Sequence, residues 1–254
     1  MSPRVSIVMP VYNEGDEIVP VLDRIFEGVT LPSEVLVVYD TSKDTTAPVL
    51  EAYAEKCPQV VPTLNTYGHG PGNAIRFGID QARAECVVVT MADGSDDPRQ
   101  IDDLARLVER GVVVAAASRY APGGQQVGGP ALKGILSRLA GLSLHLFCRI
   151  GTRDATNSFK AYQTSFVREV GIDSRAGFEI GLELTAKAKR LRRPIAEIPT
   201  IWLERQVGLS NFKLAQWIPR YLYWYRFAFG RRLTVDELKA ATRGLQAAND
   251  KEQG

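Results

Sequence analysis

The sequence predicts an α/β protein with a mainly parallel central sheet and helices on both faces. Three observations favour this fold. Short runs of β-branched and aliphatic residues recur without polar alternation, as in strands that are buried on both faces. Segments with a helical pattern separate these runs, which indicates parallel βαβ units. The chain has 254 residues, enough for one such domain with a full core.

The first half of the chain supplies most of the sheet. We expect strands at residues 5–9, 34–39, 60–64, 86–90 and 112–117. Helices should separate them, at residues 16–28, 47–56, 74–84 and 98–110. In an open α/β sheet the carboxyl ends of parallel strands meet at one edge, where ligands bind. The residues at those strand ends are Pro10, Asp40, Asp93 and Ser118.

The second half is more varied. We expect an apolar helix at residues 131–151, a polar turn and short strand at 153–162, a helix from 178, a strand at 195–202 and a loop at 204–213. Residues 214–229 are rich in aromatic side chains with arginines between them, and a polar helix and charged tail follow. We divide the chain into a domain at 1–213, which includes the apolar helix, and a segment at 214–254.

The aromatic segment at 214–229 has two interpretations. A helix that is apolar on every face is usually buried in a core. Trp and Tyr interleaved with Arg are also typical of a membrane interface, where rings contact acyl chains and cations meet phosphates. We favour the interface, and we expect Pro219 to break or kink a helix there. The chain has no apolar run of about 18 residues, so no transmembrane helix is expected.

Charge and cysteine content narrow the function. Lys and Arg total 31 against 29 Asp and Glu, a balance that argues against a nucleic-acid binder held by bulk charge. The three cysteines, Cys57, Cys86 and Cys148, match no zinc spacing, and an odd count fits a reducing cytoplasm. The N-terminus leads directly into a strand, so no signal peptide is expected.

The most informative stretch is residues 91–98, which read Met-Ala-Asp-Gly-Ser-Asp-Asp-Pro after a buried strand. Asp93 is placed to bind a hard divalent cation through oxygen, and that cation would bridge a diphosphate. The alternative is an N-capping turn, in which Asp96 or Asp97 caps the next helix. This stretch alone favours neither interpretation.

Two further motifs are ambiguous. The glycine loop at 68–73 lacks the third glycine of a dinucleotide fingerprint, and it would either present N–H groups to an anion or form a tight structural turn. Asp40 could accept hydrogen bonds from a nucleobase edge, or cap the turn that follows it. In isolation, the capping interpretation of Asp40 is favoured.

Taken in order, these motifs resemble the inverting glycosyltransferase family 2, whose members have the GT-A fold. The resemblance is carried by residues 10–14 (Pro-Val-Tyr-Asn-Glu), Asp40 with its neighbours, Ala92-Asp93, and residues 118–124 (Ser-Arg-Tyr-Ala-Pro-Gly-Gly). Residues 154–160 and 205–213 look like the branch of dolichol-phosphate mannose synthases. The combination covers roughly residues 4–215.

The resemblance implies a role for each matching residue. The nucleotide of a sugar donor would be bound by Pro10, Tyr12, Glu14 and Asp40. Asp93 would ligate Mg²⁺ or Mn²⁺ together with the diphosphate, and Asp96 could serve as a second ligand. Arg119 would lie beside the donor and acceptor phosphates. The residues that would also meet the acceptor phosphate are Arg205, Ser210 and Lys213, and those expected to act in catalysis are Asp93, Arg119 and Arg205.

The sequence departs from the family pattern in two places, at Met91 and at residues 211–212. Met91 stands where the family usually has the first Asp of its D-x-D motif, a loss that weakens cation binding or leaves water in that place. Ser95 stands where Gln or Ser is common. Asn211 and Phe212 separate Ser210 from Lys213, a spacing that differs from the family's Ser-Lys pattern.

The implied reaction is an inverting, metal-dependent transfer of a sugar from a GDP- or UDP-sugar to a polyprenyl phosphate. A phosphate monoester is already mostly anionic at neutral pH, because its second pKa is about 6, so it needs no strong base. It needs cations that hold two anions together, and Arg binds phosphate bidentately. A hydroxyl acceptor on a glycolipid or polysaccharide would instead need a base, from Asp96, Asp97 or Asp154.

Two rival functions stay open beside this one. The first is a family 2 enzyme with a hydroxyl acceptor, and the second is a catalytically silent nucleotide-sugar-binding protein, suggested by Met91. Nucleotidyl transfer would want a glycine-rich basic loop near the N-terminus, and residues 10–15 contain none. We expect a peripheral protein at the cytoplasmic face of a membrane, bound through residues 131–151 and 214–229. Nucleic acid is not an expected partner, and assembly into a homo-oligomer is left open.

Overall fold

The computed structural model describes residues 2–129, 131–175, 177–204 and 214–252. Within them, the centre of the protein is a seven-stranded sheet in the order β3-β2-β1-β4-β7-β5-β8. These strands are β1 (Val5–Pro10), β2 (Ser33–Tyr39), β3 (Val60–Leu64), β4 (Cys86–Val89), β5 (Val114–Ser118), β7 (Lys160–Gln163) and β8 (Ile195–Pro199). All run parallel except β7, which is antiparallel to both of its neighbours.

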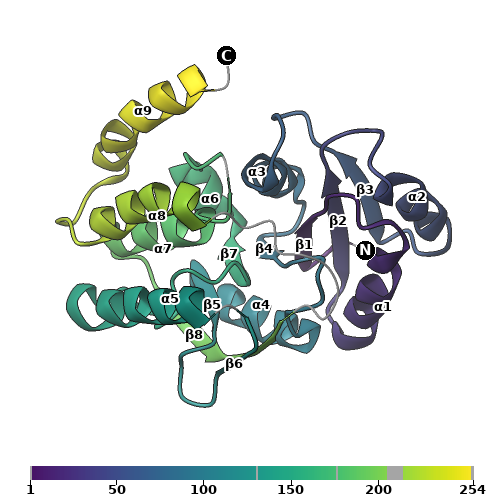
Figure 1. Cartoon of the computed structure of the whole chain (residues 1–254), viewed down its shortest axis with the longest axis horizontal. Coiled ribbons are helices and arrows are strands. Elements are labelled where there is room, and N and C mark those ends of the chain that lie inside the picture. The colour runs from purple at the N-terminus through teal and green to yellow at the C-terminus, as the bar shows by residue number, and fades with distance from the viewer. Residues whose placement is uncertain (1, 130, 176, 205–213, 253–254) are drawn as a thin grey trace.

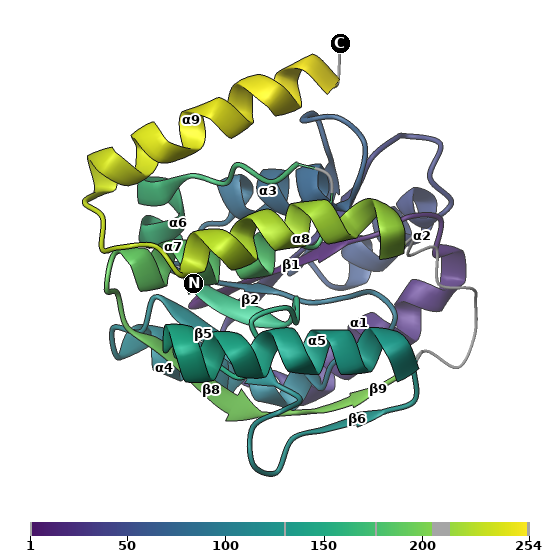
Figure 2. The same cartoon turned by 60° about the vertical axis from the view of Figure 1, so that its left-hand side comes forward.

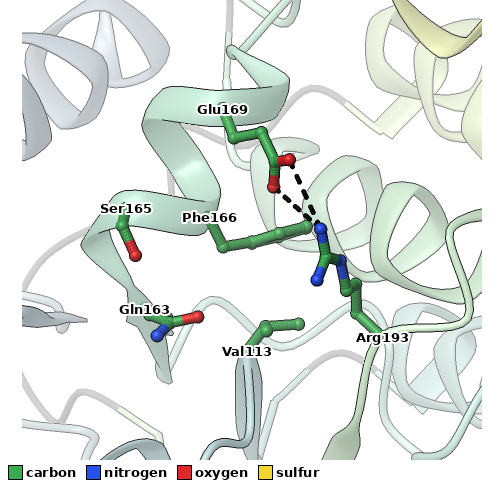
Figure 3. A pocket seen from close by; sticks show the side chains of 6 residues that line it. All are labelled: Val113, Gln163, Ser165, Phe166, Glu169 and Arg193. Carbon is green, nitrogen blue, oxygen red and sulfur yellow. Dashed lines mark hydrogen bonds and ion pairs between the residues drawn. The ribbon is translucent and has the colours of Figure 1, made fainter. Parts of the chain in front are cut away.

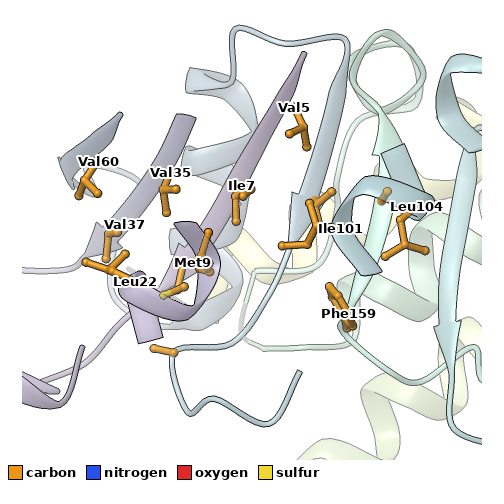
Figure 4. Packing of buried hydrophobic residues seen from close by; sticks show 14 of the residues in the cluster. Val5, Ile7, Met9, Leu22, Val35, Val37, Val60, Ile101, Leu104 and Phe159 are labelled. Carbon is orange, nitrogen blue, oxygen red and sulfur yellow. The ribbon is translucent and has the colours of Figure 1, made fainter. Parts of the chain in front are cut away.

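Side chains alternate between the two faces of the sheet, and helices cover both (Figure 1). On one face Ile7 and Met9 of β1 pack with α1 (Ile18–Gly28), α2 (Thr46–Lys56) and α4 (Ile101–Glu109) (Figure 4). On the other face Val8 belongs to a second core cluster, which includes residues of four more helices. These are α3 (Pro71–Gln81), α6 (Thr164–Val170), α7 (Ile180–Arg190) and α9 (Val235–Glu252). Short 3-10 helices at Gly15–Glu17 and Pro98–Gln100 precede α1 and α4.

Two helices from the second half form an additional layer. Helix α5 (Ala131–Ser143) continues as a π-helix at Leu144–Cys148, and α8 (Leu214–Ala228) lies beside it (Figure 2). The Ser143 hydroxyl and the Tyr225 hydroxyl are 2.9 Å apart and join the two. A separate parallel ribbon of β6 (Gln125–Val127) and β9 (Ile201–Leu203) lies next to α5.

Helix α8 is only partly a surface helix. Trp224 and Ala228 are buried in a cluster with Leu144 of the π-helix and Leu182 of α7. Helix α8 continues through Pro219, so the break expected there is absent. The core contacts stabilise the helix despite the missing N–H. The division of the chain at residue 213 stays a prediction.

The expected elements of the first half are confirmed within a few residues, and the largest shift is in α3. Helix α3 begins at Pro71 rather than at Ala74, so the end of the glycine loop forms its first turn. Proline suits this position because its fixed φ is helical and its missing N–H has no partner in a first turn. Gly72 is required there, since a Cβ would lie 2.7 Å from the backbone of Arg175.

The prediction of one strand at 195–202 is wrong. The chain leaves the central sheet after Pro199, and β9 pairs with β6 instead. Between them Thr200 donates its N–H to the carbonyl of Ser118, while Gln125 donates to the carbonyl of Thr200. None of the helices in the described residues combines the length and hydropathy that crossing a bilayer requires.

Candidate active site

The parallel registers bring four strand ends to one edge of the sheet. Pro10 of β1 is level with Val38 of β2, and Val8 is level with Val89 of β4. Strand β5 is parallel to these strands, because β7 between β4 and β5 is antiparallel to both. The expectation that Pro10, Asp40, Asp93 and Ser118 follow or end strands at the same edge is therefore confirmed.

The glycine loop supports Asp40. The Asp40 carboxylate accepts hydrogen bonds from the Asn65 side-chain amide at 2.8 Å and from the Gly70 N–H at 2.7 Å. Gly68 and Gly70 both have positive φ, which lets the backbone fold back onto this carboxylate. Asp40 therefore accepts hydrogen bonds from the 65–70 loop. The turn that follows Asp40 is capped by Asp44, whose carboxylate accepts the N–H of Thr46.

The turn after β1 presents Tyr12 to solvent. Tyr12 is 70% exposed, whereas Pro10 is buried at the end of its strand. Glu14 follows in the same turn, and its N–H donates to the Thr46 hydroxyl at 2.9 Å. Tyr12 and Asp40 thus lie on two adjacent loops at the carboxyl edge of the sheet.

The three acids after β4 have different roles. Asp97 caps the following 3-10 helix by accepting the Arg99 N–H at 3.1 Å. Asp96 is buried, and its carboxylate accepts hydrogen bonds from the Thr90 hydroxyl at 3.0 Å and the Met91 N–H at 3.2 Å. Burial, with the charge of Asp93 added, raises the pKa of Asp96 to about 7. Asp93 is half-exposed and accepts the Ser95 N–H at 3.0 Å.

Arg119 forms a two-point ion pair beneath this edge. Its Nε lies 2.7 Å from one carboxylate oxygen of Asp154, and its Nη2 lies 2.9 Å from the other. The same Nη2 donates to the Ser137 hydroxyl of α5 at 3.2 Å. Burial would lower the pKa of Arg119, but the hydrogen bonds and charge of Asp154 outweigh burial and raise it. Among the described residues, no hydrogen bond involves Nη1 of Arg119.

A buried lysine holds the turn that carries Asp154. Lys160 is fully buried, and its ammonium donates to the carbonyl of Ala155 at 3.2 Å and to the carbonyl of Asn157. Burial lowers the pKa of Lys160 to about 7, although Asp154 opposes the shift. Arg119, Asp154 and Lys160 therefore form one charged cluster within the sheet edge.

A family model described as glycosyl transferase family 2 matches residues 6–171 of the chain. The chain belongs to this family. The sequence resemblance is thereby confirmed, and the protein is a glycosyltransferase.

Two bacterial relatives of this family 2 glycosyltransferase are similar over most of its length. The undecaprenyl-phosphate mannosyltransferase of Micrococcus luteus is 31% identical over 82% of this chain and 87% of its own. The polyprenol monophosphomannose synthase of Mycolicibacterium smegmatis is 29% identical over 84% of this chain and 86% of its own. The resemblance to the dolichol-phosphate mannose synthase branch agrees with both relatives.

Solved structures confirm the GT-A fold. Glucosyl-3-phosphoglycerate synthase from Mycobacterium tuberculosis, in complex with Mn²⁺, uridine diphosphate and phosphoglyceric acid, superposes with a TM-score of 0.63 at 17% identity, covering 91% of this chain and 80% of that one. The mannosyltransferase PcManGT from Pyrobaculum calidifontis, in complex with GDP-Man and Mn²⁺, has a TM-score of 0.57 at 18% identity, covering 99% and 76%.

The acids of this family 2 glycosyltransferase fit a divalent cation that is shared with a diphosphate. No group of three or more His, Cys, Asp or Glu side chains in the described residues could hold a metal ion alone. Mg²⁺ is commonly bound through one or two carboxylates, with water and substrate phosphates as the other ligands. Beside Asp93, the Ser95 hydroxyl is buried and has no hydrogen-bond partner in the described structure, so it offers a further oxygen.

Three sequence-predicted residues lie outside the described residues. They are Arg205, Ser210 and Lys213, and their roles stay predictions. The residues that hold these side chains in place were not predicted from the sequence. Asn65 hydrogen-bonds Asp40, and Asp154 and Ser137 hydrogen-bond Arg119. Asp154 stood in a quoted motif, but no spacing signal links it to Arg119, 35 positions away.

Several large apolar side chains on α5, the π-helix and α8 are exposed. Exposed residues on α5 and the π-helix are Leu132, Ile135, Leu136, Leu139, Leu146 and Phe147, with Phe147 78% exposed. Those on α8 and just after it are Ile218, Leu222 and Phe229. We call this set the α5–α8 apolar surface, and it adjoins Arg119 through Ser137.

A pocket of about 260 Å³ lies away from the carboxyl edge of the sheet (Figure 3). It is lined in part by Val113, just before β5, and by Gln163, at the end of β7. An ion pair of Arg193 and Glu169, 3.2 Å apart, lies at its rim. It contains none of the predicted site residues.

Proposed function

We propose that this family 2 glycosyltransferase performs an inverting, metal-dependent transfer of a sugar from a GDP- or UDP-sugar to a polyprenyl phosphate. The observation that carries the proposal is the position of Arg119 between Asp154 and Ser137 of α5, directly beside the α5–α8 apolar surface. A cation fixed next to an apolar surface suits an acceptor with an anionic head and a hydrocarbon tail. The names of the two bacterial relatives support the same acceptor class.

The carboxylates of the site favour an anionic acceptor over a hydroxyl. A base must be free to take a proton. Asp154 is fully buried and bonded at both oxygens to Arg119, and Asp97 is engaged as a helix cap. Asp96 is buried and accepts two hydrogen bonds. A phosphate monoester needs none of them, because it is already anionic.

Each group then has a defined part in the reaction. Tyr12 and Asp40, with Pro10 and Glu14, bind and orient the nucleotide. Asp93, with Ser95 or Asp96 as a further oxygen ligand, holds Mg²⁺ or Mn²⁺, which when bound neutralises the departing diphosphate. Arg119 positions the acceptor phosphate through Nη1, while Asp154 keeps the guanidinium in place. Arg205, Ser210 and Lys213 complete the phosphate site.

We also propose that the protein binds the cytoplasmic face of a membrane through the α5–α8 apolar surface. Nine large apolar side chains are exposed on these elements: Leu132, Ile135, Leu136, Leu139, Leu146, Phe147, Ile218, Leu222 and Phe229. A surface of this kind, flanked by Arg138 and Arg226, is typical of an interfacial helix pair. The cysteines Cys57, Cys86 and Cys148 are free, which fits a reducing compartment.

A donor screen tests the reaction. The protein is mixed with GDP- and UDP-sugars, Mg²⁺ or Mn²⁺, and a short polyprenyl phosphate, and the lipid product is read by mass spectrometry. The matched controls are the same polyprenol without phosphate, and a chelator. We expect product only with the phosphate and the metal. Product from the polyprenol would move the assignment to a hydroxyl acceptor, and nucleotide binding without any turnover would favour the silent binder that Met91 suggests.

A further inference from the structure

The turn after β1 is fastened to the loop after β2 by a buried carboxylate. Asp44 is 5% exposed, and both of its carboxylate oxygens lie 3.1 Å from the N–H of Asn13. One of them also accepts the Thr46 N–H at 2.8 Å, at the start of α2. A single side chain therefore joins the 11–14 turn to the first turn of a helix.

Two further hydrogen bonds complete this connection. The Thr45 N–H donates to the side-chain oxygen of Asn13 at 3.2 Å, and the Glu14 N–H donates to the Thr46 hydroxyl at 2.9 Å. Asn13 adopts a left-handed backbone, with φ of 54°. Surrounding contacts must hold a non-glycine residue in this conformation, although Asn adopts it more readily than most. Here Asp44 and Thr45 do so.

The connected segments carry the predicted donor residues. Tyr12 and Glu14 flank Asn13 directly, and Asp40 begins the loop that ends at Asp44. Tyr12 is 70% exposed, and nothing in the described structure hydrogen-bonds its hydroxyl, so its position depends on the backbone of the turn. Asp44 is too deeply buried to touch a nucleotide at the surface, and any effect on the donor must pass through the turn.

We propose that Asp44 is a positioning residue for the nucleotide of the sugar donor. It fixes the left-handed turn at Asn13, and through that turn it sets the place of Tyr12 and Glu14 relative to Asp40. This inference rests on the proposed function, since it assumes that the 11–14 turn and Asp40 bind the donor nucleotide. The competing explanation is that Asp44 only stabilises the fold by capping α2.

The chain contains a matched control for that explanation. Asp102 is also 5% exposed, and its carboxylate accepts hydrogen bonds from the N–H groups of Thr30, at 3.1 Å, and Leu31, at 3.3 Å, and from the Thr30 hydroxyl. It thus connects a turn to a helix as Asp44 does. Its turn precedes β2, however, whereas the donor residues follow the strand ends.

The test compares Asp44→Asn with Asp102→Asn. Each amide offers one acceptor oxygen where the carboxylate offers two, so both variants should lower the melting temperature by similar amounts. Binding of GDP and UDP, with Mn²⁺ present, is measured by calorimetry, and KM for the donor and kcat are measured in the transfer assay. We expect Asp44→Asn alone to weaken nucleotide binding roughly tenfold, the effect of one lost charged hydrogen bond, and to raise the donor KM more than it lowers kcat.

Several outcomes would overturn the inference. Unchanged nucleotide binding in Asp44→Asn, or equal weakening in both variants, leaves Asp44 a structural cap. Should Asp44→Asn not fold, Thr46→Val gives the answer, since it keeps the side-chain shape and removes only the acceptor of the Glu14 N–H. We expect about threefold weaker binding in that variant, and no change would refute the positioning role. A wild-type protein that binds neither nucleotide would instead remove the proposed function itself.

Discussion

Arg119 and Asp154 face each other as a buried fork, with contacts of 2.7 Å and 2.9 Å that join two guanidinium nitrogens to two carboxylate oxygens. The Asp154 side chain is fully buried, and that of Arg119 is 11% exposed. Asp154 occupies one edge of the guanidinium, so Arg119 would serve both the fold and, in the reaction proposed above, the acceptor phosphate.

Asp154→Asn should therefore affect stability and transfer together. The substitution leaves a buried guanidinium without its counter-charge, and breaking such a pair costs about 3–5 kcal/mol. We expect this loss in the free energy of unfolding from urea denaturation, together with much slower transfer. The control is Glu109→Gln, which breaks the ion pair of Arg4 and Glu109. This pair is also bidentate, but it is exposed. That change should cost less than about 1 kcal/mol, and equal losses would contradict the burial argument.

Asp93→Asn should raise the metal requirement of the reaction. Removing a carboxylate ligand lowers metal affinity, and we expect at least roughly ten times more Mn²⁺ for half-maximal transfer. Asp97→Asn is the control, because this nearby acid only caps a helix. Met91→Asp restores the family's first acid and should lower the Mn²⁺ requirement. A Mn²⁺ titration that is the same for the Asp93 and Asp97 variants would remove Asp93 from the metal site.

Lys160 predicts a pH dependence of stability. Its pKa falls from 10.5 to about 7 in the folded protein because it is buried. Between these values the unfolded chain holds a proton that the folded chain lacks, so stability rises with pH, by at most about 1.4 kcal/mol per pH unit. The destabilisation caused by burying the charged Lys160 ammonium is fully present below the pKa of the folded protein. It is relieved as pH rises toward the pKa of the unfolded chain.

The measurement compares urea denaturation of the wild type and Lys160→Met between about pH 7.5 and about pH 9.5. We expect the wild type to gain stability relative to the variant over this range, because methionine does not titrate. Lys56→Met, at an exposed lysine near the end of α2, should show no such change. A constant difference between wild type and Lys160→Met would mean that Lys160 keeps its proton in the folded protein.

The α5–α8 apolar surface predicts binding to lipid vesicles. Leu139 and Phe147 are 61% and 78% exposed. Replacing both with serine removes apolar contact worth about 1.5–3 kcal/mol per fully buried side chain, so vesicle affinity should fall at least tenfold. Leu64→Ser alters an apolar residue of similar type on β3, 44% exposed, and should leave vesicle binding unchanged. Co-sedimentation with vesicles distinguishes the three proteins.

The sequence predicted the fold where local pattern decides it. Uniform apolar strands such as residues 86–89 and the helices between them were placed within a few residues. The ribbon of β6 and β9 was not foreseen, because three-residue strands carry no periodicity. Nor was the antiparallel direction of β7, since a four-residue strand looks the same in either direction.

The candidate site shows the same division. Asp40 and Asp93 could be singled out because Asp40 directly follows a buried strand and Asp93 lies in the turn after one, and a strand end is visible in the sequence. The residues that hold the site in place could not be predicted. Asn65, which hydrogen-bonds Asp40, is 25 positions away from it, and Asp44 accepts a hydrogen bond from Asn13, 31 positions earlier. Such pairings arise from the registers of β1, β2 and β3, which local pattern does not determine.

The place of β7 in the sheet bears on how the protein is made. β4 and β5 precede β7 in the chain, yet β7 lies between them and bonds to both. A nascent chain that has emerged only as far as β5 therefore exposes an unpaired edge on each of these strands. The sheet can close only after residue 163 has left the ribosome. Strand β8 (Ile195–Pro199), which pairs with the other edge of β5, is made later still. We therefore expect this domain to complete its folding late in synthesis, after β7 has paired between β4 and β5 and β8 has been added.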